Sequence, residues 1–154
     1  MRQFIALLFL FLSFLTSTVS AETIIARDAW IREAPPVSRV LAGYVELINN
    51  GDKNVQLVSV TSKHFNKVEL HQTILKNGVS KMQQQQSIDI PAGSSIELKP
   101  EGMHMMLFNP VSPLKAGHHV QLELYFNSKK KQVVEFSVRK VTGGTDHSHH
   151  HMHH

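Results

Sequence analysis

The chain has 154 residues, with 16 basic and 12 acidic side chains, a formal net charge of +4 and no cysteine. This length suits one domain with a proper hydrophobic core, and the small, dispersed positive charge gives no reason to expect a nucleic acid partner. The lack of cysteine excludes a thiolate metal site, a cysteine nucleophile and a lipid-modified N-terminal cysteine.

Residues 1–21 have the features of a secretory signal peptide. Arg2 gives a positive start, residues 4–15 are almost continuously apolar, and the small residues 19–21 form a cleavage site. The apolar run is shorter than the roughly 20 residues that a membrane-spanning helix needs. We therefore expect an exported protein without stable membrane insertion, whose mature chain starts near Glu22.

Residues 22–141 read as short strands separated by turns, and no long stretch keeps a helical period. The expected strands are residues 23–31, 40–48, 55–61, 68–73, 79–83, 94–98, 103–108, 120–126 and 133–141. The segments 49–52, 76–78, 91–93 and 127–131 carry turn residues. This pattern predicts a single all-β domain, an antiparallel sandwich or a Greek-key barrel.

The end of the chain, residues 142–154, has a different composition. It contains a glycine pair followed by six histidines and one methionine, and it lacks the apolar residues of a core. A cloning tag is one interpretation. The interleaved Asp146, Ser148 and Met152 favour a native metal-binding tail, and imidazoles suit Cu(II). The expected tail ligands are His147, His149, His150, His151, Met152, His153 and His154.

The stretch "EGMHMMLFNP" places several methionines around one histidine. Residues two apart in a strand point to the same side, so His104 and Met106 project together, away from Met103 and Met105. A methionine-rich strand is more often plain core. His71, on the strand face opposite Leu70, is a second imidazole near the end of the expected strand 68–73.

Met82 follows His71 after the turn at 76–78, so a hairpin would bring the two side chains close. The full spacing is His71, ten residues, Met82, twenty-one residues, His104, one residue, Met106. Thioethers and imidazoles are the ligands that a soft Cu(I) ion accepts, and neither forms a disulfide in an oxidising compartment. The sequence thus predicts a Cu(I) site with two histidines and two methionines.

These four positions, together with "DAWIREAPP", "AGYVELINNGD", "VELH", "IPAGSSIELKPEGMHMM" and "PLKAGHHVQLELYF", resemble the periplasmic copper chaperones of the PCuAC type. The resemblance runs from about Trp30 to Val141. It implies a cupredoxin-like fold, a periplasmic location, and delivery of Cu(I) to the dinuclear centre of cytochrome c oxidase, through its subunit II or its assembly factors. Ser80 stands where several members of that family have another methionine.

Other functions compete with that of a chaperone without enzymatic turnover. A blue-copper electron carrier needs a cysteine ligand, which the chain lacks. A non-metal β-sandwich for adhesion or assembly, and a periplasmic protein that buffers zinc or copper, stay open as alternatives. Glu69 is either a hydrogen-bond acceptor for His71 or an ordinary surface carboxylate. His64, His118 and His119 are expected to be solvated or to cap turns.

Overall fold

The computed structural model describes residues 24–141, so the predictions for the leader (residues 1–21) and the tail (residues 142–154) lie outside the described residues. Within residues 24–141 the regular structure is entirely β-strand, and no helix could span a membrane. The strands are β1 (Ile24–Arg32), β2 (Val40–Asn49), β3 (Val55–Thr61), β4 (Phe65–Lys76), β5 (Val79–Gln85), β6 (Ile88–Ile90), β7 (Ser95–Leu98), β8 (Met103–Pro110), β9 (His119–Phe126) and β10 (Lys131–Arg139). The predicted all-β architecture is confirmed.

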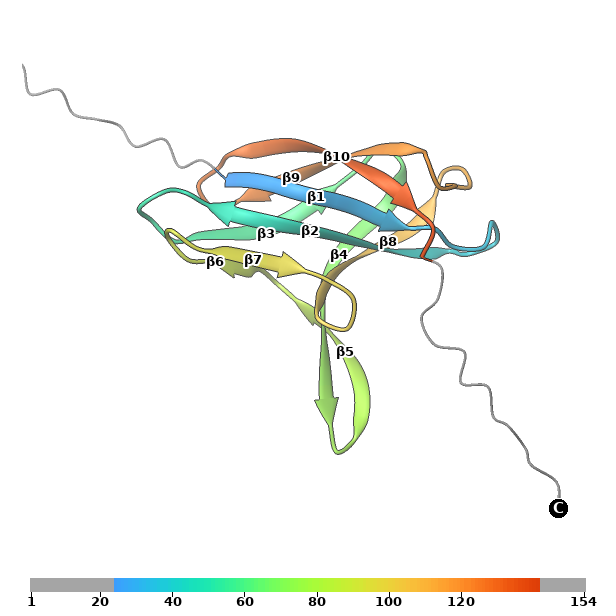
Figure 1. Ribbon diagram of the computed structural model, residues 1–154, viewed down its shortest axis with the longest axis horizontal. Helices are drawn as coiled ribbons and strands as arrows, with labels where there is room; N and C mark the ends of the chain where they lie inside the picture. The colour runs from blue at the N-terminus through green and yellow to red at the C-terminus, as the bar shows by residue number, and fades with distance from the viewer. Residues whose placement is uncertain (1–23, 142–154) are drawn as a thin grey trace, which may run out of the picture.

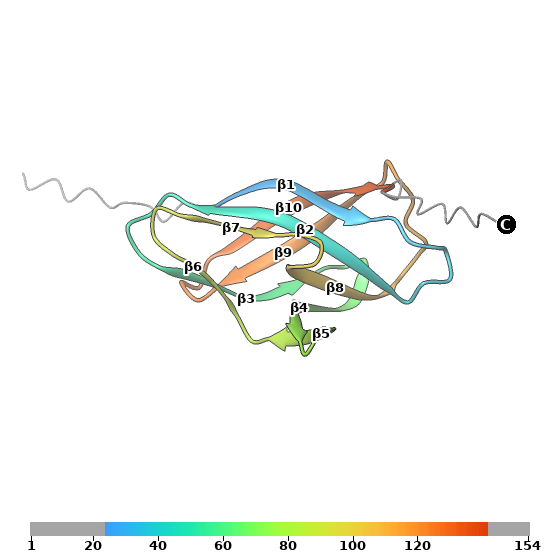
Figure 2. The same ribbon diagram turned by 60° about the horizontal axis from the view of Figure 1, so that its bottom comes forward.

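The strands form one continuous path in the order β5-β4-β8-β2-β1-β10-β9-β3-β6, and β7 pairs with β2 beside this path. The path curls round, so that strands from its two halves enclose a common core (Figures 1 and 2). Alternate apolar residues of these strands point inward, as the sequence pattern predicts. Fully buried core side chains include Ile31, Leu47, Leu57, Ile90, Met105, Leu107, Leu122, Leu124 and Phe136.

One strand pair differs from the expected antiparallel arrangement. β1 and β10 run parallel, with Trp30 opposite Ser137, whereas the other ladders of residues 24–141 are antiparallel. A tight turn forces consecutive strands to pair in antiparallel fashion. β1 and β10 are the first and the last strand in the sequence, so no turn joins them or fixes their relative direction. The sequence pattern therefore carries no signal for their parallel pairing.

The bounds of β4 and the presence of β6 also differ from expectation. β4 runs to Lys76, beyond the predicted end at Thr73, so His71 lies inside the strand instead of near its end. β6, with only three residues, was not predicted, because "IDI" is too short to show an alternating pattern. It pairs with β3 through Val55, opposite Ile90.

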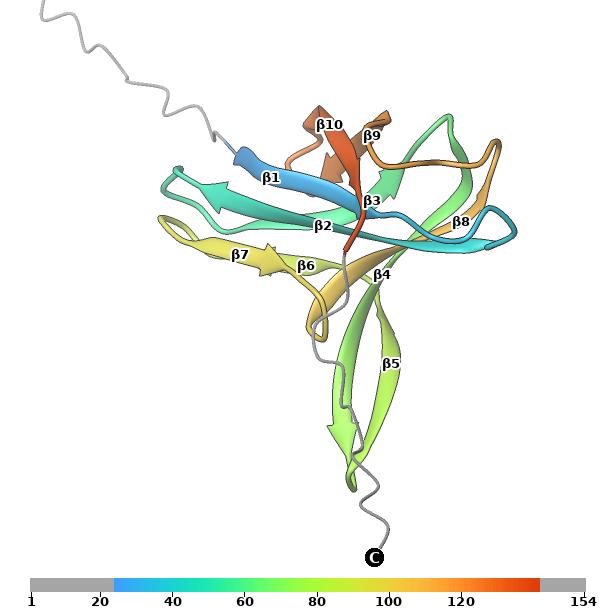
Figure 3. The same ribbon diagram turned by 45° about the vertical axis from the view of Figure 1, so that its right-hand side comes forward.

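The β4–β5 hairpin forms an arm that projects from the rest of the domain (Figures 1 and 3). Its turn residues Asn77 and Gly78 have φ angles of 53° and 77°. Positive φ at both central residues defines a type I′ turn, whose twist matches that of a hairpin and for which Asn-Gly is the preferred sequence. Leu75 and Val79 near the tip are 78% and 58% exposed, so the end of the arm lies outside the core.

A buried polar residue secures the turn that follows β2. Asn49, at the end of β2, is fully buried and donates its side-chain N–H groups to the carbonyls of Lys53 and Ile90 at 2.7 and 3.0 Å. Its Oδ1 accepts the N–H of Gly51 at 3.0 Å. Both ends of the amide therefore have partners within the chain, and the turn after β2 is tied to β6.

Candidate metal site

The pairing of β4 with β8 brings two of the predicted ligands directly opposite each other. His71 on β4 is the partner of His104 on β8, and Glu69 is the partner of Met106. Directly paired residues share one face of a sheet, as do residues two apart on a strand. Met105 between them is fully buried in the core, so the His104 and Met106 side chains lie on the face that points away from the core.

β5 adds the fourth predicted ligand to the same face. Met82 pairs with Thr73, which is two residues beyond His71 on β4. Met82 is 64% exposed, and it lines a pocket of about 400 Å³ together with His104 and Thr73. The structure thus brings the four predicted residues to one face of β5, β4 and β8, with Met82 at the outer, solvent-facing side.

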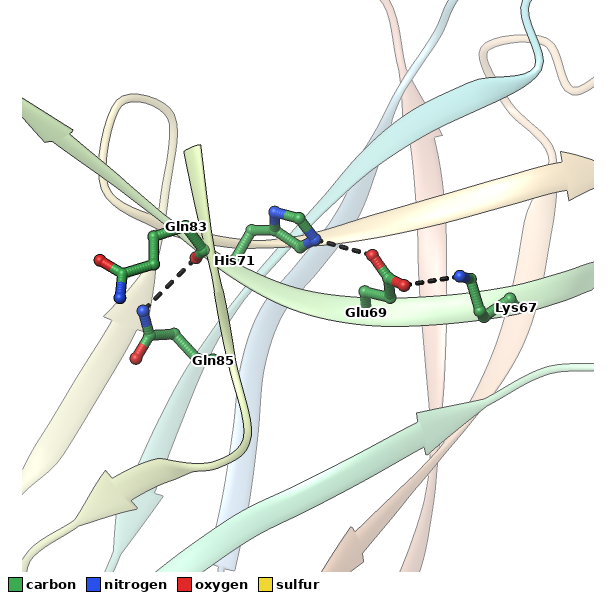
Figure 4. Close-up of polar contacts among 5 residues, drawn as sticks. All are labelled: Lys67, Glu69, His71, Gln83 and Gln85. Atoms are coloured by element: carbon green, nitrogen blue, oxygen red, sulfur yellow. Dashed lines mark hydrogen bonds and ion pairs between the residues drawn. The ribbon is translucent and has the colours of Figure 1, made fainter. Parts of the chain in front are cut away.

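The His71 ring is held on one side and unpartnered on the other. Its Nε2 lies 2.8 Å from Oε2 of Glu69 (Figure 4). Its Nδ1 is buried and has no hydrogen-bond partner. Among the side chains of residues 24–141, it is the only buried nitrogen or oxygen atom of which this is true. Buried polar atoms are nearly always paired, so an orphan nitrogen marks a position where a ligand can bind.

Glu69 is the central member of a chain of polar contacts on β4. Its Oε1 accepts a hydrogen bond from Nζ of Lys67 at 2.6 Å (Figure 4). Lys67 also lies over the ring of Phe108, 5.0 Å from its centre. The hydrogen bond from Lys67, and secondly that from His71, lowers the pKa of Glu69 below its usual range. The residue is therefore a carboxylate at neutral pH and acts as an acceptor toward His71.

His104 is held through its other ring nitrogen. The residue is only 6% exposed, and Nδ1 donates to the carbonyl oxygen of Gly102 at 3.0 Å. The same carbonyl accepts the backbone N–H of Thr73 at 3.1 Å, which ties β4 to the turn before β8. The centres of the His71 and His104 rings are 6.0 Å apart, with 35° between the ring planes.

The pocket beside His104 has an aromatic and cationic wall that the spacing of the ligands does not indicate. Tyr44 on β2, Arg32 on β1 and Ser80 on β5 line it. Burial raises the pKa of Tyr44, although the hydrogen bond and charge of Arg32 act in the opposite direction. Trp30 stacks on Tyr44 with ring centres 4.5 Å apart. These strands are distant in sequence, so only the fold brings them to the site.

The remaining histidines of the described chain lie away from this face. His119 pairs with Glu135 at 3.1 Å on the exposed surface, and His118 accepts the N–H of Lys115 at 3.3 Å. His64 lies at an exposed turn. Within residues 24–141 no three His, Asp or Glu side chains gather closely enough to hold a metal ion by themselves. The tail histidines lie outside the described residues.

The fold of this chain is similar to that of solved PCuAC domains. The copper-bound PCuAC domain from PmoF2 superposes with a TM-score of 0.66 at 19% identity, covering 77% of this chain and 93% of that domain. The solution structure of CuI-DR1885 from Deinococcus radiodurans gives a TM-score of 0.66 at 25% identity, over 84% of this chain and 87% of that one. The predicted cupredoxin-like fold is confirmed.

Residues 24–138 match the family described as "Putative lipoprotein LpqE-like", and the chain belongs to this family. "Putative lipoprotein Lxx21020" of Leifsonia xyli subsp. xyli is 32% identical over 127 residues, which are 82% of this chain and 75% of the relative. Protein RP573 of Rickettsia prowazekii is 34% identical over 101 residues, 63% of this chain and 54% of that relative.

Proposed function

We propose that the protein is a copper carrier of the cell envelope that binds one Cu(I) ion through His71, Met82, His104 and Met106 and performs no turnover. The observation that carries this proposal is the register between β4 and β8, which sets the two imidazoles opposite each other. Both methionines lie on the same outward face. Two imidazoles and two thioethers suit a soft monovalent copper ion and offer no oxygen ligands for Mg²⁺ or Ca²⁺.

The separation of the two histidine rings supports a shared ion. An imidazole–metal bond of about 2.0 Å, the value known for zinc, places a metal about 3 Å from the ring centre, so two rings on one ion have centres at most about 6 Å apart, and closer where the two bonds form a bent angle. The observed distance of 6.0 Å lies at this upper limit, so a small movement of the side chains would bring both rings onto one ion. Two solved neighbours of this fold, the copper-bound PCuAC domain from PmoF2 and CuI-DR1885, hold copper, and this supports the proposal.

The route of the copper is part of the same proposal. We place the protein in the periplasm, exported by residues 1–21, with the dinuclear centre of cytochrome c oxidase as the destination. The exposed Met82 suits this role, because an acceptor can approach the ion from the side where it lies. Mixing the Cu(I)-loaded protein with the soluble copper domain of oxidase subunit II, and measuring copper on each after separation, tests delivery. Copper that stays on the donor would contradict this destination.

The core site is tested by a matched pair of substitutions on β8. Met106→Leu removes a proposed sulfur ligand, while Met103→Leu removes a sulfur from the opposite face of the same strand, where Met103 packs against the core. Leucine conserves the volume in both, so folding changes little. Competition titration against a Cu(I) chelator should show weaker binding for Met106→Leu alone. Equal affinities would move the site elsewhere, and no Cu(I) binding in the unchanged protein would favour the adhesion or assembly alternative.

The tail forms the second part of the proposal. His147, His149, His150, His151, His153 and His154, with Met152, are proposed to capture Cu(II), which imidazoles bind better than thioethers do. A chain that ends after Gly144 should lose Cu(II) binding, as followed by electron paramagnetic resonance, and keep one Cu(I) per molecule. Undiminished Cu(II) binding in the shortened chain would leave the tail without this role.

A further inference from the structure

The two histidines of the site are held by different ring nitrogens, and this difference has a chemical consequence. Nε2 of His71 faces a carboxylate oxygen of Glu69 at 2.8 Å, whereas Nδ1 of His104 faces the carbonyl oxygen of Gly102 at 3.0 Å. Both partners are acceptors only. Each of these ring nitrogens must therefore carry the proton in its hydrogen bond.

A neutral imidazole has one N–H group and one nitrogen with a free lone pair. In His71 the lone pair is then on Nδ1, the buried atom that has no hydrogen-bond partner among residues 24–141. In His104 the lone pair is on Nε2. Only a nitrogen with a free lone pair can bind a metal, so the hydrogen bonds select opposite nitrogens on the two facing rings.

We propose that Glu69 is a positioning residue that directs His71 to bind copper through Nδ1, while His104 binds through Nε2. This inference rests on the proposed Cu(I) site. Figure 4 shows Glu69 between Lys67 and His71, with the second nitrogen of the His71 ring on the side away from the carboxylate. A ring rotated to present Nε2 to the metal would lose the hydrogen bond to Glu69.

Lys67 completes the arrangement by fixing the carboxylate. Its ammonium group lies 2.6 Å from Oε1 of Glu69, which leaves Oε2 directed at His71. The Glu69 side chain is 16% exposed and that of His71 13%, so water competes little for their contact. Hydrogen bonds of this kind to metal-binding histidines fix the tautomer and the ring orientation, and their loss typically lowers metal affinity about 10- to 100-fold.

The end of β7, outside the strands of the site, offers a matched control pair. Lys99 and Glu97 are also two residues apart, with Nζ 3.2 Å from Oε2, but no histidine lies in contact with that carboxylate. Both side chains are 60% exposed. Glu97→Ala therefore removes a comparable lysine–carboxylate pair without touching the proposed site.

The test uses long-range proton–nitrogen NMR of the ¹⁵N-labelled full chain, before and after loading with Cu(I). Cu(I) is a closed-shell ion, so the imidazole resonances stay observable, and single histidine substitutions assign them. We expect the Nδ1 resonance of His71 and the Nε2 resonance of His104 to shift on loading, while Nε2 of His71 keeps its proton. In Glu69→Ala the His71 ring should populate both tautomers, and Cu(I) affinity should fall about 10- to 100-fold.

Glu69→Gln provides the rescue variant, because its amide oxygen can still accept the Nε2 proton. It should keep the His71 tautomer and most of the affinity, and Glu97→Ala should match the unchanged protein in both measurements. Copper bound to Nε2 of His71 in the unchanged protein, or an unaltered His71 spectrum in Glu69→Ala, would overturn the inference and leave the Cu(I) site standing. If neither histidine responds to Cu(I), it is the proposed function that fails.

Discussion

Two regions of the domain differ in how their buried polar groups are paired. At the turn after β2, the amide of Asn49 has three hydrogen bonds to its own chain. On the face of β4 and β8, His71 has a buried nitrogen with no such bond, and the neighbouring His104 is buried with one ring nitrogen held. The hydrogen bonding of the Asn49 amide is complete as folded, whereas Nδ1 of His71 can still form a bond to a ligand.

This contrast separates a structural polar residue from a functional one. A buried group that lacks a partner costs about 1–3 kcal/mol, so a protein keeps one only where something else depends on it. Sequences that fold well satisfy their buried polar groups, and the exceptions concentrate at functional sites. We therefore expect the turn after β2 and the face of β4 and β8 to respond differently to substitution and to copper.

The largest expected effect comes from removing His71, the residue with the unpartnered nitrogen. His71→Leu takes away a proposed ligand together with the unpartnered nitrogen. Cu(I) affinity should fall by more than about 100-fold, since losing only the partner of a ligand costs about 10- to 100-fold. The free energy of unfolding should change little, because removal of the unpartnered nitrogen offsets loss of the hydrogen bond to Glu69. His119→Leu on β9 is the control, and chelator competition with denaturant unfolding measures both quantities. A large loss of stability without loss of affinity would make His71 structural.

Copper bound at the face of β4 and β8 should stabilise the folded protein. At a free Cu(I) concentration 100 times the dissociation constant, binding to the folded state alone adds about 2.7 kcal/mol to the free energy of unfolding. Anaerobic denaturant titrations with chelator-buffered Cu(I) measure this gain. His71→Leu should lose it under the same conditions. A gain that persists in that variant would assign the stabilising copper to other residues, such as those of the tail.

Asn49→Ala tests the turn after β2, where the buried amide has all its partners. The substitution leaves the carbonyl of Ile90 and the N–H of Gly51 without their partner, and leaving a buried group unsatisfied costs about 1–3 kcal/mol. Cu(I) affinity should not change, because none of the groups that Asn49 contacts belongs to the proposed site. Asn50→Ala, at an exposed neighbouring position, is the control for stability. A change in copper affinity would show that the turn and the site are coupled.

The smallest effect concerns stability in acid and the carboxylate of Glu123 on β9, which belongs to neither of these two regions. The hydroxyl of Tyr125 donates to Glu123 at 2.6 Å and Lys131 lies 3.4 Å away, and these contacts, that of Tyr125 first, lower the pKa of Glu123. A lowered folded pKa contributes stability above the unfolded value of about 4.3, and this contribution disappears as the pH falls through the folded value.

Glu123→Gln should therefore lose less stability than the unchanged protein when the pH is lowered from neutral to about 3, as measured by denaturant unfolding at each pH. Copper affinity at neutral pH should be the same in both. Parallel pH profiles would mean that the contacts of Glu123 with Tyr125 and Lys131 contribute nothing to acid stability.

The sequence predicted much of the candidate site because local rules fix much of it. Alternation along a strand sets His104 and Met106 on one face, and the Asn77-Gly78 turn fixes how Met82 is placed relative to β4. The pairing of His71 with His104 joins strands that are not consecutive in sequence. The shared spacing with a known family suggested that His71 and His104 lie close together, but not their register.

Other features could not be read from the sequence for physical reasons. The parallel pair of β1 and β10 depends on closure of the whole sheet. Arg32 and Tyr44 reach the pocket from strands far from the ligands in sequence, so no spacing reveals them. The Lys67-x-Glu69-x-His71 alternation did place all three on one face, yet which histidine nitrogen meets Glu69 depends on the ring orientation.

The position of β5 at the border of the sheet has a kinetic consequence. Within the described chain β5 is bonded to β4 alone, so Met82 is attached to the domain by a single ladder, while His71 and His104 belong to interior strands. Local opening is easiest where few buried contacts must break. A four-coordinate ion would then shed one thioether by fraying of the arm, and the vacant coordination position would admit an incoming ligand before the two imidazoles let go.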